Sequence, residues 1–300
     1  MTSNPGLFMT DFIRTTNKDS RWGEFYEPVS PKLNSGNGLR VVLFVSCNCG
    51  NNVLNTLSLL EQKHPGLLNL TGVVTDDPVD PDARISLKKR IWSQYTPSER
   101  SELKRKIVNS CMKIGIPCYT GAVKTDYFRH IYQSWNPDIL IMFCFGQKLD
   151  SFLFDFPAMG SFNLHPSDLP KQIGAGTQPF QNAIRNGLKT SPLVIHQVTE
   201  LIDIGPIVGV SPPINICLAD GTYPKSLLTL LEKITSMGGW MSLQLILETI
   251  RLKSKGETGP LTWIDFEKEL PEEIKYRLMM PAVDDLTEMY ELPLHPILVK

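Results

Sequence analysis

The sequence predicts an α/β fold in which a mostly parallel sheet carries helices on both faces. Two observations support it: short apolar runs bounded by Gly, Asn or Pro are typical of buried strands, and helical segments separate these runs. A strand, helix, strand order implies parallel pairing through a right-handed crossover. Of the 300 residues, 42% are hydrophobic and 20% charged, which excludes wholesale disorder and coiled-coil chains.

The first half of this sheet is predicted between residues 40 and 144. Residues 40–45 and 70–75 are apolar runs typical of strands, and 52–62 between them is a helix. The capping box Thr96-Pro-Ser-Glu99 predicts a second helix start, and Gly115 ends that helix. Residues 138–144 form the clearest buried strand of the chain.

The second half continues the alternation. A strand is expected over 160–165, stopped by Pro166, followed by a helix over 179–186. Further strands are expected over 193–199 and 207–210. A long helix should follow over 222–252, where Gly238-Gly239 marks either a kink or a close-packing point.

Three regions follow from this pattern. Residues 1–38 are polar and are expected to be an irregular extension, 39–252 form one domain, and 253–300 are an extension with short helices. The longest apolar run, 139–145, is too short to span a bilayer, and the N-terminus lacks a secretory signal pattern. The six cysteines include no Cys-x-x-Cys pair, which is typical of reduced thiols. We therefore expect a soluble, cytoplasmic protein with no membrane partner.

Charge gives little support for a polyanionic partner. Thirty Lys and Arg residues against thirty-one Asp and Glu residues leave a net charge of -1. The basic stretch 88–106 is interpreted as a solvated helix face, with contact to an anionic acceptor as the alternative. Cys47 and Cys49 have no second ligand pair, so no metal site is expected.

The side chains best suited to catalysis lie in two segments. In Asn163-Leu-His165-Pro-Ser, the two-residue spacing places an amide and an imidazole on the same face of a strand end, where open α/β sheets bind ligands. The alternative is that these are polar residues at the end of a strand with no catalytic role. In the second segment, Asp203 follows a strand and precedes the Gly205-Pro206 turn. Its alternative role is an Asx-type turn residue.

Together the two segments resemble the folate-dependent formyltransferase family. That family has Asn-x-His-(Pro or Gly)-Ser before a Leu-Pro turn, then a strand with His-x-Val-Thr/Asp-Glu, and Asp-x-Gly-Pro-Ile. This chain carries the first pattern from Asn163 to Pro170 and the second from His196 to Ile207, and the 40 residues from Asn163 to Asp203 fit the family. The resemblance covers residues 39–250. It implies a Rossmann-like formyltransferase fold with 39–252 as its catalytic domain.

The resemblance also implies the reaction and the site. A formyl group would pass from 10-formyltetrahydrofolate to an amine without a metal, with Asn163 and His165 donating to the oxyanion and Asp203 holding the imidazolium. The implied folate contacts, largely main chain, are Phe143, Cys144, Phe145, Gly146, Gln147, Leu149, Thr199, Ile202 and Gly205. The implied acceptor contacts are Asn48, Gly50, Asn51, Ser167 and His196.

The acceptor is where this chain departs from the family pattern. Residues 171–176 replace the family's Arg-Gly after the Leu-Pro turn, and the loop 46–52, which resembles the phosphate-binding glycine loop of glycinamide ribonucleotide formyltransferases, has a cysteine for one glycine. An ordinary strand-to-helix turn is the favoured interpretation of that loop.

Residues 261–300 carry nine acidic and four basic residues, so a nucleic-acid partner is not expected. A small amine acceptor, chiefly a nucleotide-linked amino sugar, is preferred. The alternatives are glycinamide ribonucleotide, water in a formyltetrahydrofolate hydrolase, and a folate-binding module without turnover. A homodimer is left open.

Overall fold

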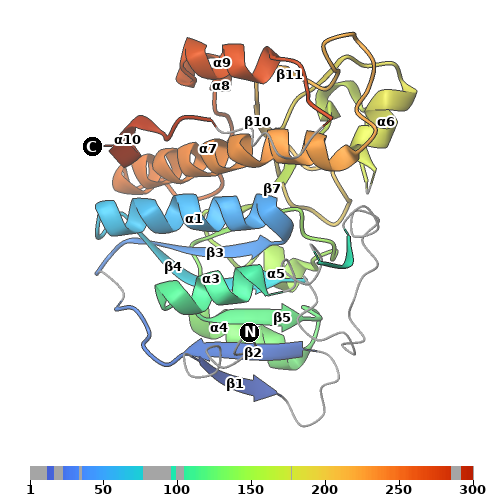
Figure 1. The fold of residues 1–300 in the computed structure, drawn as a ribbon. Coiled ribbons are helices and arrows are strands. Elements are labelled where there is room, and N and C mark those ends of the chain that lie inside the picture. The colour runs from blue at the N-terminus through green and yellow to red at the C-terminus, as the bar shows by residue number, and fades with distance from the viewer. Residues whose placement is uncertain are drawn as a thin grey trace.

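A nine-stranded sheet forms the centre of the molecule (Figure 1). The computed structural model describes residues 12–16, 23–33, 36–76, 96–98, 105–176, 178–284 and 292–299. In spatial order the strands are β1 (Phe12–Thr16), β2 (Gly23–Pro28), β5 (Cys118–Gly121), β4 (Leu68–Thr75), β3 (Leu39–Val45), β6 (Ile139–Phe143), β7 (Ser161–His165), β9 (Val194–Gln197) and β10 (Ile207–Val210).

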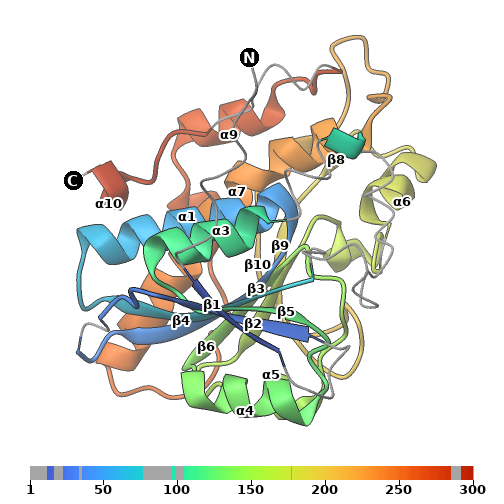
Figure 2. The same cartoon turned by 60° about the horizontal axis from the view of Figure 1, so that its bottom comes forward.

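The five central strands, from β5 to β7, pair in parallel, and the pairs outside them are antiparallel. One face is covered by α1 (Cys47–Lys63), α3 (Lys106–Ile114) and α7 (Leu227–Ser254), and the other by α4 (Asp126–Trp135) and α5 (Ser151–Phe154) (Figures 1 and 2). The predicted α/β fold, a mostly parallel sheet with helices on both faces, is confirmed.

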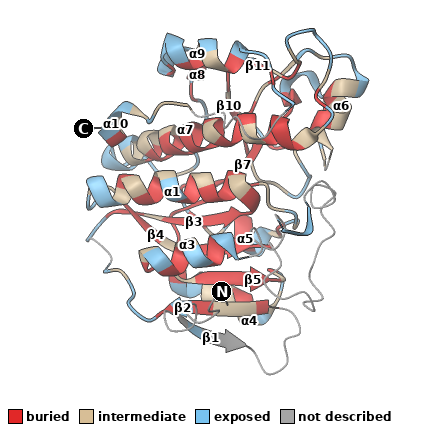
Figure 3. Cartoon of the chain, viewed as in Figure 1, coloured by how far each residue is buried: buried red, intermediate tan, exposed pale blue. Residues whose placement is uncertain are grey.

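The hydrophobic core consists of two layers because strand residues alternate between the faces of the sheet. In β3, Val41, Leu43 and Val45 pack beneath α1 and α7, whereas Val42 and Phe44 pack against α4. Figure 3 shows the buried residues concentrated in the sheet and on the inner faces of the helices. The central strands β3 and β6 are buried on both faces, which explains why residues 41–45 and 139–143 are continuous apolar runs in the sequence.

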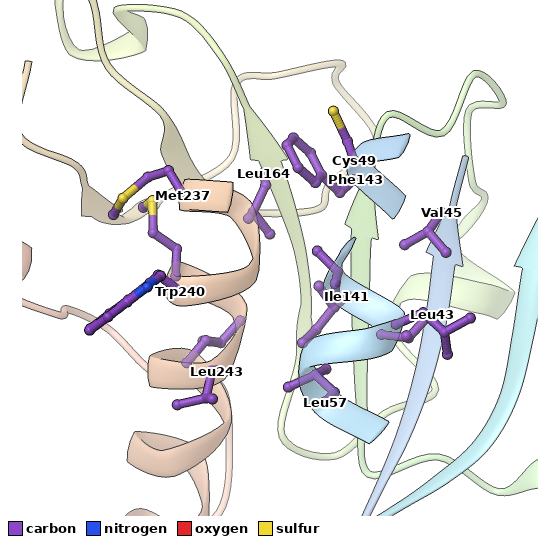
Figure 4. Close-up of a cluster of buried hydrophobic side chains, with 14 of the residues drawn as sticks. Leu43, Val45, Cys49, Leu57, Ile141, Phe143, Leu164, Met237, Trp240 and Leu243 are labelled. Atoms are coloured by element: carbon purple, nitrogen blue, oxygen red, sulfur yellow. The ribbon is translucent and has the colours of Figure 1, made fainter. Parts of the chain in front are cut away.

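The long helix α7 is continuous through its two glycines, which are close-packing points. A Cβ atom at Gly238 would lie 2.2 Å from Cε1 of Phe143, and one at Gly239 would lie 2.3 Å from Oδ1 of Asn52. Figure 4 shows Phe143 in the apolar cluster shared by α7, α1 and the strands. The glycines therefore let α7 approach both the sheet and α1.

The N-terminal stretch differs from the sequence-based expectation. Residues 1–38 are not irregular throughout, because β1 pairs with β2 and β2 pairs with β5, both antiparallel. These two strands were not predicted because they are short and polar and because β5 lies far from them in sequence. A search for buried apolar runs does not detect such strands. Of the helix expected from Thr96 to Gly115, residues 99–104 lie outside the described ranges. Helix α3 begins at Lys106, with Arg105 as its N-cap residue, and ends at Gly115 in a left-handed conformation as predicted.

The remaining elements are short. They are the 3-10 helix η2 (Leu169–Lys171), α6 (Pro179–Arg185), the two-stranded sheet of β8 (Thr190–Ser191) and β11 (Ile214–Asn215), and the C-terminal α8 (Phe266–Glu269), α9 (Glu272–Met279) and α10 (Pro296–Val299). Within the described ranges, no helix is long and apolar enough to cross a membrane.

We expect Gly238→Ala to destabilise the protein although alanine is the better helix former. The added methyl group must displace the fully buried Phe143, and overpacking of this kind costs about 1 to 3 kcal/mol. Urea unfolding should show this loss. Arg251→Ala, a substitution of an exposed residue on the same helix, should stay within about 0.5 kcal/mol of the parent protein, and equal stability of the two variants would contradict the packing role of Gly238.

Candidate active site

The polar side chains singled out in the sequence meet at one edge of the sheet. Asn163 and His165 lie at the carboxyl end of β7, and His196 on β9 is the direct cross-strand partner of Asn163. Asp203 follows β9 in the loop that leads to β10. The structure thus brings together one amide, two imidazoles and one carboxylate.

Local backbone geometry turns Asp203 back toward the strands. Asp203 has φ 56°, in the left-handed region that aspartate tolerates better than most residues. Two residues on, a Cβ atom at Gly205 would lie 1.8 Å from the carbonyl oxygen of Gln197, so only glycine fits there. This tight return explains the Asp-x-Gly-Pro pattern of the sequence.

The carboxylate of Asp203 is the centre of the cluster, and its side chain is only 8% exposed. Its Oδ2 accepts a hydrogen bond from the backbone N–H of Gly176 at 2.8 Å and lies 3.7 Å from Nδ1 of His165. Its Oδ1 lies 3.3 Å from Nδ2 of Asn163 and 3.3 Å from Nε2 of His196. A buried carboxylate needs such partners, because removing a charge from water without compensation is costly.

The other members also have defined partners. His165 donates Nε2–H to the carbonyl of Gly174 at 2.9 Å, and Nδ1 of His196 lies 2.9 Å from the carbonyl of Gln197. Nδ2 of Asn163 lies 3.1 Å from Nε2 of His196 as well as near Asp203. The amide of Asn163 therefore donates to Asp203 within the protein and also lies beside Nε2 of His196. A ligand oxygen would have to replace one of these partners to be bound by Asn163.

Near neutral pH, one of the two titratable groups at the centre of the site, Asp203, is charged and the other, His165, is neutral. Burial alone would raise the pKa of Asp203, but the hydrogen bond with His196, the nearby His165 and the N–H of Gly176 outweigh it, and the pKa lies below 3.8. Burial lowers the pKa of His165 below 6.5, although Asp203 and the carbonyl of Gly174 oppose this shift. The resting cluster therefore pairs a carboxylate with a neutral imidazole.

A cavity of about 470 Å³ opens beside this cluster. Asn163, His165, His196 and Asp203 line it, together with the loop after β6, the loop after β9 and the first turns of α6 and α7. Of the nine residues predicted to contact folate, the seven that line it are Cys144, Phe145, Gly146, Gln147, Leu149, Thr199 and Ile202. Phe143 and Gly205 do not line it: Phe143 is fully buried in the core and Gly205 packs against Gln197.

The loop after β6 is held in place by groups that the sequence analysis missed. Asp76, at the end of β4, accepts a hydrogen bond from the N–H of Gly146 at 2.7 Å and another from the hydroxyl of Ser46. The side chain of Gln147 donates to the carbonyl of Gly121 at 2.7 Å, so it binds the protein. This loop, from Cys144 to Leu149, lines the cavity. The position of Asp76 directly after a strand was the signal available in the sequence.

Four of the five predicted acceptor contacts lie outside the cavity. Helix α1 begins at Cys47, so residues 47–52 of this segment form its first turns, and Gly50 packs against Val45. Nδ2 of Asn48 donates to Glu232 at 2.8 Å, and Oδ1 of Asn51 accepts from Ser110 at 2.8 Å. Ser167 is buried, and its hydroxyl has no partner among the described residues. His196 alone of the five lines the cavity.

Several apolar residues of the cavity wall were not predicted, and four of them lie on helices. They are Cys47 at the start of α1, Phe180 on α6, and Leu227 and Leu231 on α7. Helical periodicity identifies such residues as buried but does not distinguish a core contact from a cavity wall. Of the predicted basic stretch 88–106, only residues 96–98 and 105–106 fall in the described part of the chain, and Lys106 donates to Oδ1 of Asn48 at 2.7 Å.

In the part of the chain that the structure describes, no group of three or more His, Cys, Asp or Glu side chains is arranged to hold a metal ion.

Comparison with known proteins agrees with this geometry. Residues 39–223, more than half of the chain, match the family model described as formyl transferase. The chain is 33% identical over 159 residues to a methionyl-tRNA formyltransferase of Thermodesulfovibrio yellowstonii, covering 51% of this chain and 48% of the relative. It is 32% identical over 142 residues to the methionyl-tRNA formyltransferase of Anaplasma marginale, covering 46% of this chain and 44% of the relative.

These alignments span about half the length of the curated relatives. A solved structure of phosphoribosylglycinamide formyltransferase from Anaplasma phagocytophilum is similar with a TM-score of 0.50 and 17% identity, covering 76% of this chain and 98% of the other. At this identity the likeness concerns the fold alone.

Acidification should destabilise the protein through His165. Its pKa is lower in the folded protein than the ordinary 6.5, so the unfolded chain binds the proton more tightly. The stabilising contribution is complete above the unfolded pKa and is lost as the pH falls below it. The free energy of unfolding in urea should therefore decrease as the pH is lowered from about 7 to about 5. This decrease should be smaller in His165→Gln than in the control His130→Gln, because the ring of His130 is exposed in the parent protein. Equal decreases in the two variants would show that the pH dependence does not come from His165.

Proposed function

The chain belongs to the formyl transferase family, and we propose that it transfers a formyl group from 10-formyltetrahydrofolate to an amine. The observation that carries the proposal is the buried carboxylate of Asp203, which faces the imidazole of His165 and the amide of Asn163 at the wall of one cavity. We take residues 39–252 as the catalytic domain. The cytoplasmic location and a homodimer stay predictions.

The cavity fits a folate head group. Its volume of about 470 Å³ is typical of small-molecule sites, and its wall combines apolar residues with the loop after β6. A pteridine has flat apolar faces and a hydrogen-bonding edge, which such a wall can satisfy. When bound, 10-formyltetrahydrofolate would supply the activated formyl carbon.

The residues around that carbon have complementary tasks. The neutral ring of His165 is able to take a proton from the attacking amine, because burial lowers its pKa and the nearby carboxylate stabilises the imidazolium that forms. The amide of Asn163 exchanges a partner within the protein for the oxyanion that develops on the formyl oxygen. Asp203 fixes both groups, and the N–H of Gly176 fixes Asp203.

The acceptor is the finer part of the proposal. The nucleotide-linked amino sugar preferred from the sequence has no counterpart in the names of the two relatives described above, which specify methionyl-tRNA. The apolar wall formed by Cys47, Phe180, Leu227 and Leu231 also offers few partners for sugar hydroxyls. We therefore propose an amine next to an apolar side chain, such as an aminoacyl ester. The amino sugar is the second candidate, because the C-terminal residues are acidic.

Glycinamide ribonucleotide is a weaker candidate. The loop that would receive its phosphate is engaged by other parts of the protein, and the carboxylate of Glu232 lies 2.8 Å from Nδ2 of Asn48. A second negative charge at this position would meet that carboxylate. The hydrolase and the binding module without turnover are tested by the experiments below.

Replacing His165 by alanine should lower kcat for formyl transfer by about 100- to 1,000-fold, the usual effect of removing one group that stabilises the transition state. Binding of 10-formyltetrahydrofolate, measured by calorimetry, should change by only a few fold. His130→Ala serves as the control because this histidine is exposed and lies outside the cavity. Near-normal turnover in His165→Ala would remove His165 from catalysis, and binding without any turnover by the parent protein would favour the module without activity.

Release of tetrahydrofolate should depend on the acceptor. We expect negligible release in the absence of an amine, and stimulation by methionyl ester or methionyl-tRNA that exceeds stimulation by a nucleotide-linked amino sugar. The apolar cavity wall is the physical reason for this order. Steady release without an amine would identify a hydrolase, and preference for the sugar would restore the acceptor expected from the sequence.

A further inference from the structure

Two loops that line the cavity are joined at its rim by an ion pair. The ammonium of Lys148, in the loop after β6, lies 3.8 Å from Oε2 of Glu200, in the loop after β9. Lys148 lines the cavity, and so do Thr199 and Leu201 on either side of Glu200. The side chains of the pair are 45% and 67% exposed, whereas that of Asp203 is 8% exposed. The pair therefore marks the open side of the cavity, and Asp203 marks its enclosed side.

Lys148 differs in charge from the other residues of the cavity wall. Among the residues that line the cavity in the described part of the chain, it is the only lysine or arginine. The one carboxylate among them, that of Asp203, already accepts from the N–H of Gly176 and lies beside two imidazoles. An anionic group of a ligand would thus meet one permanent positive charge, and this charge lies at the rim.

The backbone on both sides of Lys148 is held in place. The N–H of Gly146 donates to Oδ2 of Asp76 at 2.7 Å. The side-chain amide of Gln147 both donates to and accepts from the backbone at the end of β5, and Leu149 is buried. The base of the lysine side chain is therefore fixed, and only its flexible stem has to adjust to a ligand.

The contact between Lys148 and Glu200 is easily exchanged. Its 3.8 Å separation is longer than a hydrogen bond, and ion pairs between exposed side chains contribute little to stability. A carboxylate that arrives with a ligand is able to replace Glu200 and to form a charge-assisted hydrogen bond with the ammonium.

We infer that Lys148 binds the glutamate tail of the folate donor and favours donors with more tail carboxylates, an inference that rests on the proposed function. In 10-formyltetrahydrofolate, the formyl-bearing N10 lies between the pteridine head and the benzoylglutamate tail. With the formyl group beside Asn163 and His165 and the head in the cavity, the tail leaves through the rim. Its carboxylates meet the ammonium there, and each further glutamate of a polyglutamate adds another negative charge.

The test compares three ligands that share one head group and differ in tail charge. They are tetrahydrofolate, its diamide with both tail carboxylates amidated, and its triglutamate, with binding measured by calorimetry under reducing conditions. We expect the parent protein to bind tetrahydrofolate about 5-fold more tightly than the diamide, and the triglutamate more tightly still. Salt at about 0.5 M should reduce these differences, because it screens exposed charges.

Variants identify the charge responsible. In Lys148→Met the three affinities should agree within about twofold, whereas Lys148→Arg should keep the order of the parent protein. Glu200→Gln removes the competing carboxylate and should increase the preference for the charged tails. Lys113→Met serves as the control, because Lys113 is an exposed residue of α3 outside the cavity.

The outcomes separate this inference from the proposed function. An unchanged order of affinities in Lys148→Met, or an equal loss of affinity for all three ligands, would overturn the role of Lys148 and leave the proposed function standing. Failure of the parent protein to bind any of the three ligands would overturn the proposed function and the inference together.

Discussion

One buried carboxylate determines how the ends of three segments are arranged. Asp203 contacts side chains of β7 and β9 and the backbone at Gly176, which is part of the loop between η2 and α6. Because its side chain is almost fully enclosed, it must satisfy its charge with these groups, and the groups in turn are fixed by it. The same charge opposes the lowering of the pKa of His165 by burial. The positions of Asn163 and His165 and the pKa of His165 thus depend on Asp203, a single residue in a left-handed turn.

A second carboxylate has the corresponding role on the other wall of the cavity. Asp76 binds the hydroxyl of Ser46 after β3 and the N–H of Gly146 after β6, so it links the ends of three parallel strands. This leaves Ser46 without a capping bond to α1 and orients the turn in which Cys47 and Cys144 face the cavity. Polar groups at strand ends therefore shape the cavity, while the apolar layers beneath provide a rigid base.

The elements that could be predicted from the sequence are those in which one physical requirement dominates. The parallel strands β3, β4, β6 and β7, the helix α7 and the left-handed end of α3 at Gly115 follow from hydrophobic patterning and glycine conformation, whereas the short parallel strand β5 was not predicted. The strand β2 could not be predicted because its partner β5 is remote in sequence, and pairing with it is a tertiary effect. Likewise, strand-end spacing identified Asn163, His165 and Asp203 as candidates, but not that Asn48 binds Glu232 or that Phe143 points into the core. Those outcomes depend on which helix packs beside each loop.

The pairing of β2 with β5 also constrains the order in which the protein forms during synthesis. Strand β2, at residues 23–28, leaves the ribosome long before residues 118–121, the only neighbour that joins it to the central strands among the described residues. Until then β1 and β2 are at most an isolated hairpin, which is marginally stable in water. The nascent chain therefore carries unpaired strand edges while α1, β4 and α3 are made, a period in which chaperone binding or mispairing competes with the native sheet.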